Sequence, residues 1–372
     1  YNEYIFHKSS FNWYTEINKG NDNINSRFRE TIPSPVSPMF PPHCGERKAL
    51  MKKLALLALC LSLCTACVSG ASAATKFITI GTAGTAGALY PMGVAMAQTI
   101  TDHVDGVSAT GEATAASIQN LRDLHEGNTE LGISQSEVAY YAYNGQMDYE
   151  GNAFTDIRAL YSTIYNYLQV FVAADSDINS IADLAGKTVS MGSAGSGGEM
   201  AARALLNAYG LDYSKLTAQF MGESDGASAL KDGTIDAMIA THPLGSAALT
   251  ELTTSMNVKM IPIAESNFYD AYPLYTPCTV PAGTYNGVNV DVVIPRSRII
   301  MCTSTNSGLS DDEVYEIVKA VWENRDEWAG CAKSVEKQAT LENVLGEISI
   351  PLHPGAIRYF EEIGVAIPDN LK

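Results

Sequence analysis

The chain has 372 residues, with 24 Lys and Arg against 41 Asp and Glu, so its formal net charge is −17 at pH 7. A chain this acidic repels nucleic acid and anionic membrane surfaces, and neither is expected as a partner. The length suffices for two globular domains of ordinary size.

Residues 1–50 do not resemble the start of a folded domain. The segment has no initiating Met, little hydrophobic periodicity and a proline-rich stretch from Pro33 to Pro42. Residues 45–48, Gly-Glu-Arg-Lys, require purine-rich codons, as a ribosome-binding site just upstream of Met51 would. We therefore interpret residues 1–50 as a non-native leader and Met51 as the start of the protein.

Residues 51–73 have the pattern of a secretory signal peptide. Two lysines precede an apolar core from Leu54 to Leu63, which is too short to span a bilayer as a helix. The small residues 71–73, Ala-Ser-Ala, predict cleavage after Ala73 and export to the periplasm. The alternative is lipidation of Cys67, but Cys64 stands where a lipobox has leucine, and we favour cleavage.

Cleavage changes the bulk properties of the chain. Residues 1–73 hold eight of the basic and five of the acidic residues, so the mature chain has 16 basic and 36 acidic residues and a net charge near −20. Three cysteines remain, Cys278, Cys302 and Cys331, which allow one disulfide or none. No Cys-x-x-Cys pair and no histidine spacing indicates a metal site, so none is expected.

The first folded unit is a strand, a glycine loop and a helix. The β-branched run before Gly81 predicts a strand, residues 81–90 a loop, and Pro91 the first helical position. Such a unit aims unpaired backbone N–H groups and the positive end of a helix dipole at whatever lies above the loop. The loop therefore indicates a site for a small anion.

Similar units follow along the chain. Thr114 is the predicted N-cap of the next helix, and residues 134–137 cap another that begins at Val138. Strands are expected at 131–133, 167–173, 187–191, 235–240, 290–294 and 299–301, and helices at 118–125, 198–209, 227–231, from Pro243 and from Asp311.

Strands that alternate with helices predict an α/β fold with mostly parallel sheets, whose ligands bind beyond the carboxyl ends of the strands. Four loops leave those ends, at residues 81–90, 114–120, 134–136 and 192–198. They carry hydroxyls, glycines and amides but no cluster of acids. The pattern indicates a binding protein without catalytic residues or a cofactor.

Other functions fit the residues less well. The first glycine loop lacks the Gly-x-Gly of the dinucleotide fingerprint, and the second has Met200 where the third glycine belongs. No Gly-x-x-x-x-Gly-Lys-Ser/Thr occurs, and Ala194 replaces the first glycine of a Gly-x-Ser-x-Gly around Ser196. NAD, ATP and serine hydrolysis are therefore disfavoured. Glu112, Glu137 and Glu199 are interpreted as acids favoured at helix starts.

The order and spacing of several motifs, from about Lys76 to the C-terminus, resemble the TAXI family of solute-binding subunits of TRAP (tripartite ATP-independent periplasmic) transporters. The motifs are residues 80–91, 114–121, 135–137, 184–192, 195–197, 230–237, 281–285 and 352–356. Three departures from the family are a loop poorer in glycine, Glu137 in place of Asp, and Thr-His-Pro at 241–243 in place of Gly-x-Pro.

The resemblance implies a type II periplasmic-binding-protein fold, with two α/β lobes, a hinge and a ligand cleft between them. The chain would cross the hinge at residues 165–173 and 288–301. Lobe 1 would then comprise residues 76–164 plus 297–372, and lobe 2 residues 165–296. The motif at 353–356 is expected to be a structural turn.

The family further implies the function. Its members capture a small carboxylate, such as a glutamate- or glutamine-like amino acid or a dicarboxylate, by closure of the cleft. They deliver it to TRAP membrane permease subunits. We expect a monomer that is not an enzyme. The alternative is a periplasmic sensor of the same fold that serves a signalling partner.

The loops supply the expected ligand contacts. The carboxylate would accept bonds from the backbone of residues 85–88 and from Thr114, Ser117 and Asn120, while lobe 2 closes over it. Tyr161 is expected either at the cleft or in the core. The full set is Thr85, Ala86, Gly87, Ala88, Tyr90, Thr114, Ser117, Asn120, Gln135, Ser136, Tyr161, Ser193, Ser196, Gly197, Thr241 and His242.

Overall fold

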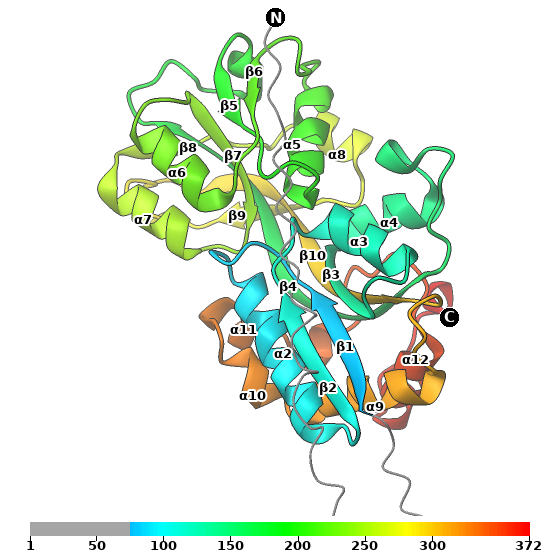
Figure 1. Cartoon of the computed structure of the whole chain (residues 1–372). Helices are drawn as coiled ribbons and strands as arrows, with labels where there is room; N and C mark the ends of the chain where they lie inside the picture. The colour runs from blue at the N-terminus through cyan, green and yellow to red at the C-terminus, as the bar shows by residue number, and fades with distance from the viewer. Residues whose placement is uncertain (1–74) are drawn as a thin grey trace, which may run out of the picture. The chain divides into compact units, whose positions relative to one another are not determined.

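One mixed sheet runs through the protein, with the strand order β2-β1-β3-β10-β4-β7-β5-β6, β8 paired with β4 and β9 paired with β10 (Figure 1). The computed structural model describes residues 75–372, so the predicted leader, the signal peptide and Cys67 lie outside the described residues. The strands are β1 (Lys76–Gly81), β2 (Val107–Glu112), β3 (Leu131–Gln135), β4 (Ile157–Ala173), β5 (Thr188–Ser190), β6 (Thr217–Gln219), β7 (Ala237–His242), β8 (Val258–Met260), β9 (Thr276–Val280) and β10 (Val292–Ser304).

Helices follow most of the strands, which confirms the α/β prediction. The expectation of mostly parallel sheets is wrong, because β4 and β10 pair antiparallel with all their neighbours. The α-helices are α2 (Leu89–His103), α3 (Ser117–His125), α4 (Ser136–Asn144), α5 (Gly197–Ala208), α6 (Glu223–Lys231), α7 (Ala247–Ser255), α8 (Ser266–Ala271), α9 (Asp311–Glu323), α10 (Arg325–Ala329), α11 (Lys333–Gln338) and α12 (Pro354–Glu362). Short 3₁₀ turns lie at η1 (Met147–Tyr149), η2 (Ile181–Leu184), η3 (Leu341–Asn343) and η4 (Asp369–Leu371).

The sheet contains two sets of parallel strands. In the first, β1 lies between β2 and β3; in the second, β5 lies between β6 and β7. The long strands β4 and β10 pair antiparallel with each other and join the two sets. We call them the central ribbon. The predicted hinge crossings fall in this ribbon, but β10 is one continuous strand where two shorter ones were expected. The division into two lobes stays a prediction.

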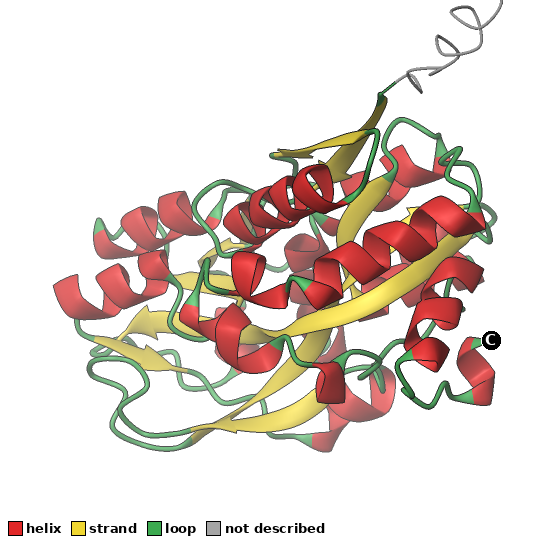
Figure 2. Ribbon diagram, turned by 90° about the horizontal axis from the view of Figure 1, so that it is seen from below, coloured by secondary structure: helices red, strands yellow, loops and turns green. Residues whose placement is uncertain are grey.

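Helices cover both faces of the sheet (Figure 2). The central ribbon alternates its side chains between these two faces. Leu168, Val170 and Val172 pack on one face in a cluster with α5. Tyr167 and Phe171 pack on the other face in a cluster with α6 and α7. This alternation follows from the two-residue period of a strand, so one apolar run supplies two cores.

Five predicted helix starts need correction. Helix α4 begins at Ser136 rather than at Val138, and α6 begins at Glu223 rather than at Ala227. Helix α2 begins at Leu89, two residues before Pro91. Helix α3 begins at Ser117 with Ala116 as its N-cap, because the Thr114 hydroxyl instead accepts the Ala116 N–H at 3.0 Å and donates to the Thr82 carbonyl at 3.1 Å. Helix α7 begins at Ala247 rather than at Pro243, since an extended Ser246 still separates them.

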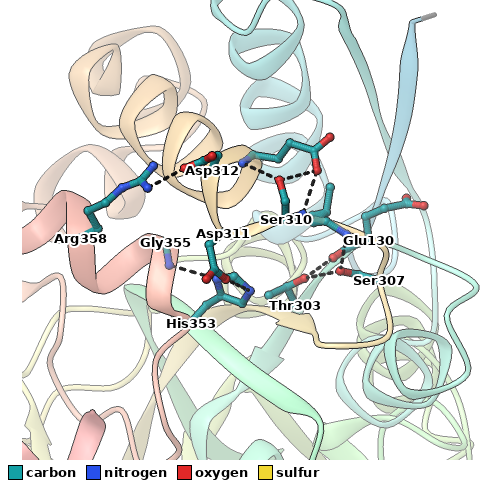
Figure 3. Close-up of polar contacts among 11 residues, drawn as sticks. Glu130, Thr303, Ser307, Ser310, Asp311, Asp312, His353, Gly355 and Arg358 are labelled. Atoms are coloured by element: carbon teal, nitrogen blue, oxygen red, sulfur yellow. Dashed lines mark hydrogen bonds and ion pairs between the residues drawn. The ribbon is translucent and has the colours of Figure 1, made fainter.

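The C-terminal helices pack on α2, on the first set of strands. Figure 3 shows the ion pair that joins α12 to α9, in which Arg358 lies 2.6 Å from Asp312. At the start of α9, Ser310 forms a capping box with Glu313. His353 is buried and caps α12, accepting the Gly355 N–H at 3.2 Å. The residues expected to form a structural turn therefore start a helix.

Within the described part of the chain, no helix combines the length and the apolar character needed to cross a bilayer.

Candidate functional site

The candidate site is a cavity of about 230 Å³ at the carboxyl ends of both sets of parallel strands. Loops after β1, β2 and β3 form what we call the first wall, made of residues 83–87, 89, 114–117, 133 and 135. Loops after β5, β6 and β7 form the second wall, made of residues 190, 192, 193, 196, 198, 221–225 and 238–242. Asn166 and Ile299 of the central ribbon also line the cavity. This is where an open α/β sheet binds ligands.

The first wall presents helix starts with free backbone donors. Neither α2 nor α3 has a side-chain hydrogen bond at its N-cap, and neither has an acidic residue in its first turn. The first N–H groups of a helix have no partner within the helix, so they remain available to a ligand. Together with the helix dipoles, they favour a negatively charged group at this wall.

Ala116 in the first wall has a strained backbone. Its φ of 72° and ψ of −145° lie in a region that is nearly restricted to glycine and costs about 1–3 kcal/mol. The strain is held by the Thr114 hydroxyl on one side and the start of α3 on the other. Strain of this kind is retained where the surrounding structure requires it, and here it directs the first N–H groups of α3.

Serine hydroxyls on both walls have a proton to donate. Ser117 accepts the Gln135 N–H at 3.0 Å, and Ser196 caps α5 by accepting the Glu199 N–H at 3.0 Å. Because each hydroxyl accepts here, its own O–H can point at a ligand.

The second wall also carries acids. Glu223 and Asp225 occupy the first turn of α6, whose N-cap Gly222 makes no side-chain hydrogen bond. Glu223 is 8% exposed, accepts the Ser246 hydroxyl, and lies 3.5 Å from the His242 ring (Nδ1 to Oε2). Burial lowers the pKa of His242 although Glu223 opposes the shift, so the ring is neutral at pH 7.

The two walls touch each other beside the cavity. A Cβ added to Gly197, the first residue of α5, would overlap Oε1 of Gln135 and lie 2.7 Å from Oγ of Ser117. A Cβ on Gly87 would approach Nδ1 of His242 to 3.8 Å. With Gln135 and Ser117 in these positions no side chain fits at Gly197, so glycine there permits the close approach of the second wall to the first.

Behind this contact lies a buried carboxylate. Glu137 of α4 is fully buried, and its Oε1 accepts the Gln135 amide at 2.7 Å. Burial raises its pKa to about 7, while hydrogen bonds from Ser297 and Tyr275 hold the rise back. Gln135 therefore links the cavity to a group that titrates near neutral pH.

A family model described as the NMT1-like family matches residues 80–364, most of the chain. The chain belongs to the NMT1-like family. The matched range includes both walls of the cavity. The TAXI subtype expected from the motifs is finer than this match and stays a prediction.

Solved structures show the fold of this NMT1-like protein. PhnD1 from Prochlorococcus marinus, solved with methylphosphonate, aligns at a TM-score of 0.50 and 9% identity over 78% of this chain and all of its own. The periplasmic aliphatic sulphonate binding protein SsuA from Escherichia coli aligns at 0.39 and 14% identity over 77% and 78% of the two chains. The α/β fold of this chain is therefore that of PhnD1.

The cavity brings together ten of the sixteen residues predicted for this NMT1-like chain. They come from all four predicted loops and from the end of β7: Thr85, Ala86, Gly87, Thr114, Ser117, Gln135, Ser193, Ser196, Thr241 and His242. Their role in binding stays a prediction. The other six do not line the cavity: Ala88, Tyr90, Asn120, Ser136, Tyr161 and Gly197.

Two of these six are structural, which corrects the prediction. The Asn120 amide is buried and donates to the carbonyls of Gly81, Thr82 and Ile133 at 3.1, 2.7 and 2.8 Å. It holds the ends of β1 and β3 together instead of meeting a ligand. Tyr161 is fully buried against Met96 and Trp322, so the core alternative is the correct one.

Other lining residues were not predicted. Asn166 lies on β4, and Glu223 and Asp225 follow β6. The three-residue strand β6 has no apolar pattern from which to predict it. The loop after it was therefore not recognised as one that leaves the end of a strand. The one available signal was a glycine, Gly222, directly before two acids at the start of a helix. Among residues 75–372 no cluster of His, Cys, Asp and Glu has the arrangement of a metal site.

Proposed function

We propose that this protein is an extracytoplasmic solute receptor that captures a small carboxylate in the cavity and delivers it to a TRAP permease. The observation that carries the proposal is the first wall, where α2 and α3 begin at the cavity without side-chain caps or acids. This is the arrangement by which proteins bind an anion without a basic side chain.

The chemistry suits a carboxylate. Backbone N–H groups near residues 85–87 and the Ser117 hydroxyl would donate to its two oxygens. Hydrogen bonds to an ionised acceptor are about twice as strong as neutral ones, so a few are enough to hold the group. Ser193 and Ser196 on the second wall would add donors when the walls meet. Binding is then coupled to the contact between the walls, without any catalytic step.

The permease partner is proposed from the TAXI-like motifs, above all the glycine loop and residues 114–121. A TRAP permease gene beside this one, and solute uptake that needs both genes, would support delivery to such a permease. A signalling gene in that position would favour the sensor alternative instead. We propose a periplasmic, monomeric protein in either case.

A thermal-shift screen of the purified protein over amino acids, dicarboxylates and neutral sugars tests the capture function. A solute at 100 times its dissociation constant should stabilise the protein by about 2.7 kcal/mol. We expect a clear shift from a carboxylate and a smaller one for Ser117→Ala. A shift from neutral sugars alone would contradict the carboxylate proposal.

A further inference from the structure

Two of the residues that line the cavity each carry a buried hydrogen-bond acceptor without a partner among the described residues. The acceptors are Oε2 of Glu223 and Oδ1 of Asn166, on residues that are 8% and 4% exposed. A buried carboxylate oxygen or amide oxygen without a donor costs free energy, more for the charged group. An unpaired acceptor at a cavity is satisfied when a ligand supplies the missing donor.

The protein does not neutralise these acids itself. No Lys or Arg is among the cavity-lining residues of the part described, while Glu223 and Asp225 both are. His242 beside Glu223 is uncharged at neutral pH, because burial lowers its pKa. Glu223 lies at the start of α6, and the Ser246 hydroxyl donates to its Oε1. Oε2 has the uncharged His242 ring 3.5 Å away and makes no hydrogen bond among the described residues.

A dicarboxylate fits this charge distribution poorly. One of its carboxylates would meet the donors of the first wall, but the other would lie in the same small cavity as Glu223 and Asp225. Like charges that share a site without a cation repel strongly in a low-dielectric interior. An ammonium group has the opposite sign and three N–H donors for the unpaired oxygens.

We propose that Glu223, with Asn166 and Asp225, forms an ammonium subsite, so that the solute is an α-amino acid rather than a dicarboxylate. The inference rests on the proposed function, since the carboxylate of the same molecule is taken by the first wall. The net charge of the solute is zero or positive, because the acids of the second wall repel any second carboxylate. The two ends of one zwitterion then contact opposite walls.

The test compares matched pairs of solutes that differ only at the subsite. Each α-amino acid of a neutral and basic panel is measured by calorimetry against the 2-hydroxy acid with the same skeleton, together with succinate and putrescine. We expect at least one amino acid to bind about tenfold or more tightly than its hydroxy acid. Glu223→Gln should remove that preference and weaken the amino acid about tenfold or more.

Glu199→Gln is the matched control. Glu199 is as buried as Glu223 and also lies in the first turn of a helix, but its carboxylate accepts the Tyr213 hydroxyl and does not line the cavity. The affinity of Glu199→Gln for the amino acid should differ from that of the wild type by less than twofold. If Glu223→Gln does not fold, Asp225→Asn and the comparison of the matched solutes on the wild type still decide the question.

The outcomes separate the two proposals. Succinate or a hydroxy acid that binds as tightly as any amino acid, or equal affinities for wild type and Glu223→Gln, would overturn the ammonium subsite and leave the carboxylate receptor standing. If putrescine alone bound, and Glu223→Gln lost that binding, the ammonium subsite would be supported and the proposal of a carboxylate receptor would be overturned. No binding across the panel would overturn both.

Discussion

The two walls of the cavity have the same backbone arrangement, but one presents hydrogen-bond donors and the other presents acids as well. Each is built from the ends of three parallel strands and the starts of the helices that follow. In the first wall, α2 and α3 have no acid in the first turn, and the helix starts remain free for an anion. In the second, Glu223 and Asp225 occupy the start of α6. The same helix dipole can therefore favour an anion at one wall, while the acids in the first turn oppose an anion at the other.

The largest expected effect tests whether Asn120, behind the first wall, stabilises the fold or contacts the ligand. Asn120→Ala removes the donor of three buried carbonyls and should lower the free energy of unfolding by about 3 kcal/mol. Urea denaturation measures this. The exposed Asn128→Ala should change it by less than about 0.5 kcal/mol. If Asn120→Ala kept its stability but lost solute affinity, Asn120 would be a ligand contact after all.

A second expected effect tests the buried carboxylate where the walls meet. The pKa of Glu137 is about 7 in the folded protein against an ordinary 4.5, so the folded state binds the proton more tightly. The stabilisation this gives is full below pH 4.5 and is lost as pH rises through 7. Glu137→Gln carries no such proton. Relative to wild type, its stability should rise between pH 4.5 and pH 8, by up to about 3 kcal/mol at roughly 1.4 kcal/mol for each pKa unit.

Urea denaturation of both proteins at pH 4.5, 6 and 8 checks this, with the exposed Glu150→Gln as a control that should show no such trend. A constant difference between wild type and Glu137→Gln over the whole range would show that folding does not raise the pKa of Glu137.

Gly197→Ala tests whether the walls must touch. The new methyl group would overlap Gln135 and Ser117, so the second wall cannot come as close to the first. We expect solute affinity to fall about tenfold, or about 1.4 kcal/mol, with smaller changes in thermal stability. Gly330→Ala, at a helix end with φ of −68° and only the Asp326 carbonyl at 3.9 Å, is the matched control. Equal affinities for Gly197→Ala and wild type would mean that contact between the walls is not required.

The smallest expected effect concerns an ion pair between α5, which follows a loop of the second wall, and η1, which follows α4. Arg203 of α5 pairs with Asp148 of η1, and both side chains are about one-third exposed. Pairs this exposed contribute less than about 1 kcal/mol and weaken with salt. Asp148→Asn should therefore weaken solute binding by no more than about fivefold in 50 mM salt. The difference should vanish at 1 M salt, and one that persists there would point to packing instead of charge.

The loops that form the site could be predicted from the sequence more accurately than the side chains that line it. Loops after strands with a clear apolar run, such as residues 81–90 and 192–198, lie at the cavity as predicted. Asn120 and Tyr161 were placed by their position along the chain, but whether a polar side chain faces a cavity or the core depends on tertiary packing. Both proved to be buried.

The acids of the second wall were the largest omission. Glu223 follows β6, a strand of three partly exposed residues with no alternation to identify it. Without that strand, Gly222 and Glu223 look like an ordinary helix start. The sequence therefore indicated a wall of donors alone, and only the three-dimensional structure placed a carboxylate opposite them.

The central ribbon has a mechanical consequence. Because β4 and β10 are continuous strands of 17 and 13 residues, any motion between the walls must bend a hydrogen-bonded ladder rather than turn about a flexible loop. The register shifts near Arg298 and Met301 are irregular points where such a ladder bends and twists most easily. The stiffness of that short stretch would set how far the walls separate, and amide exchange there would report each opening.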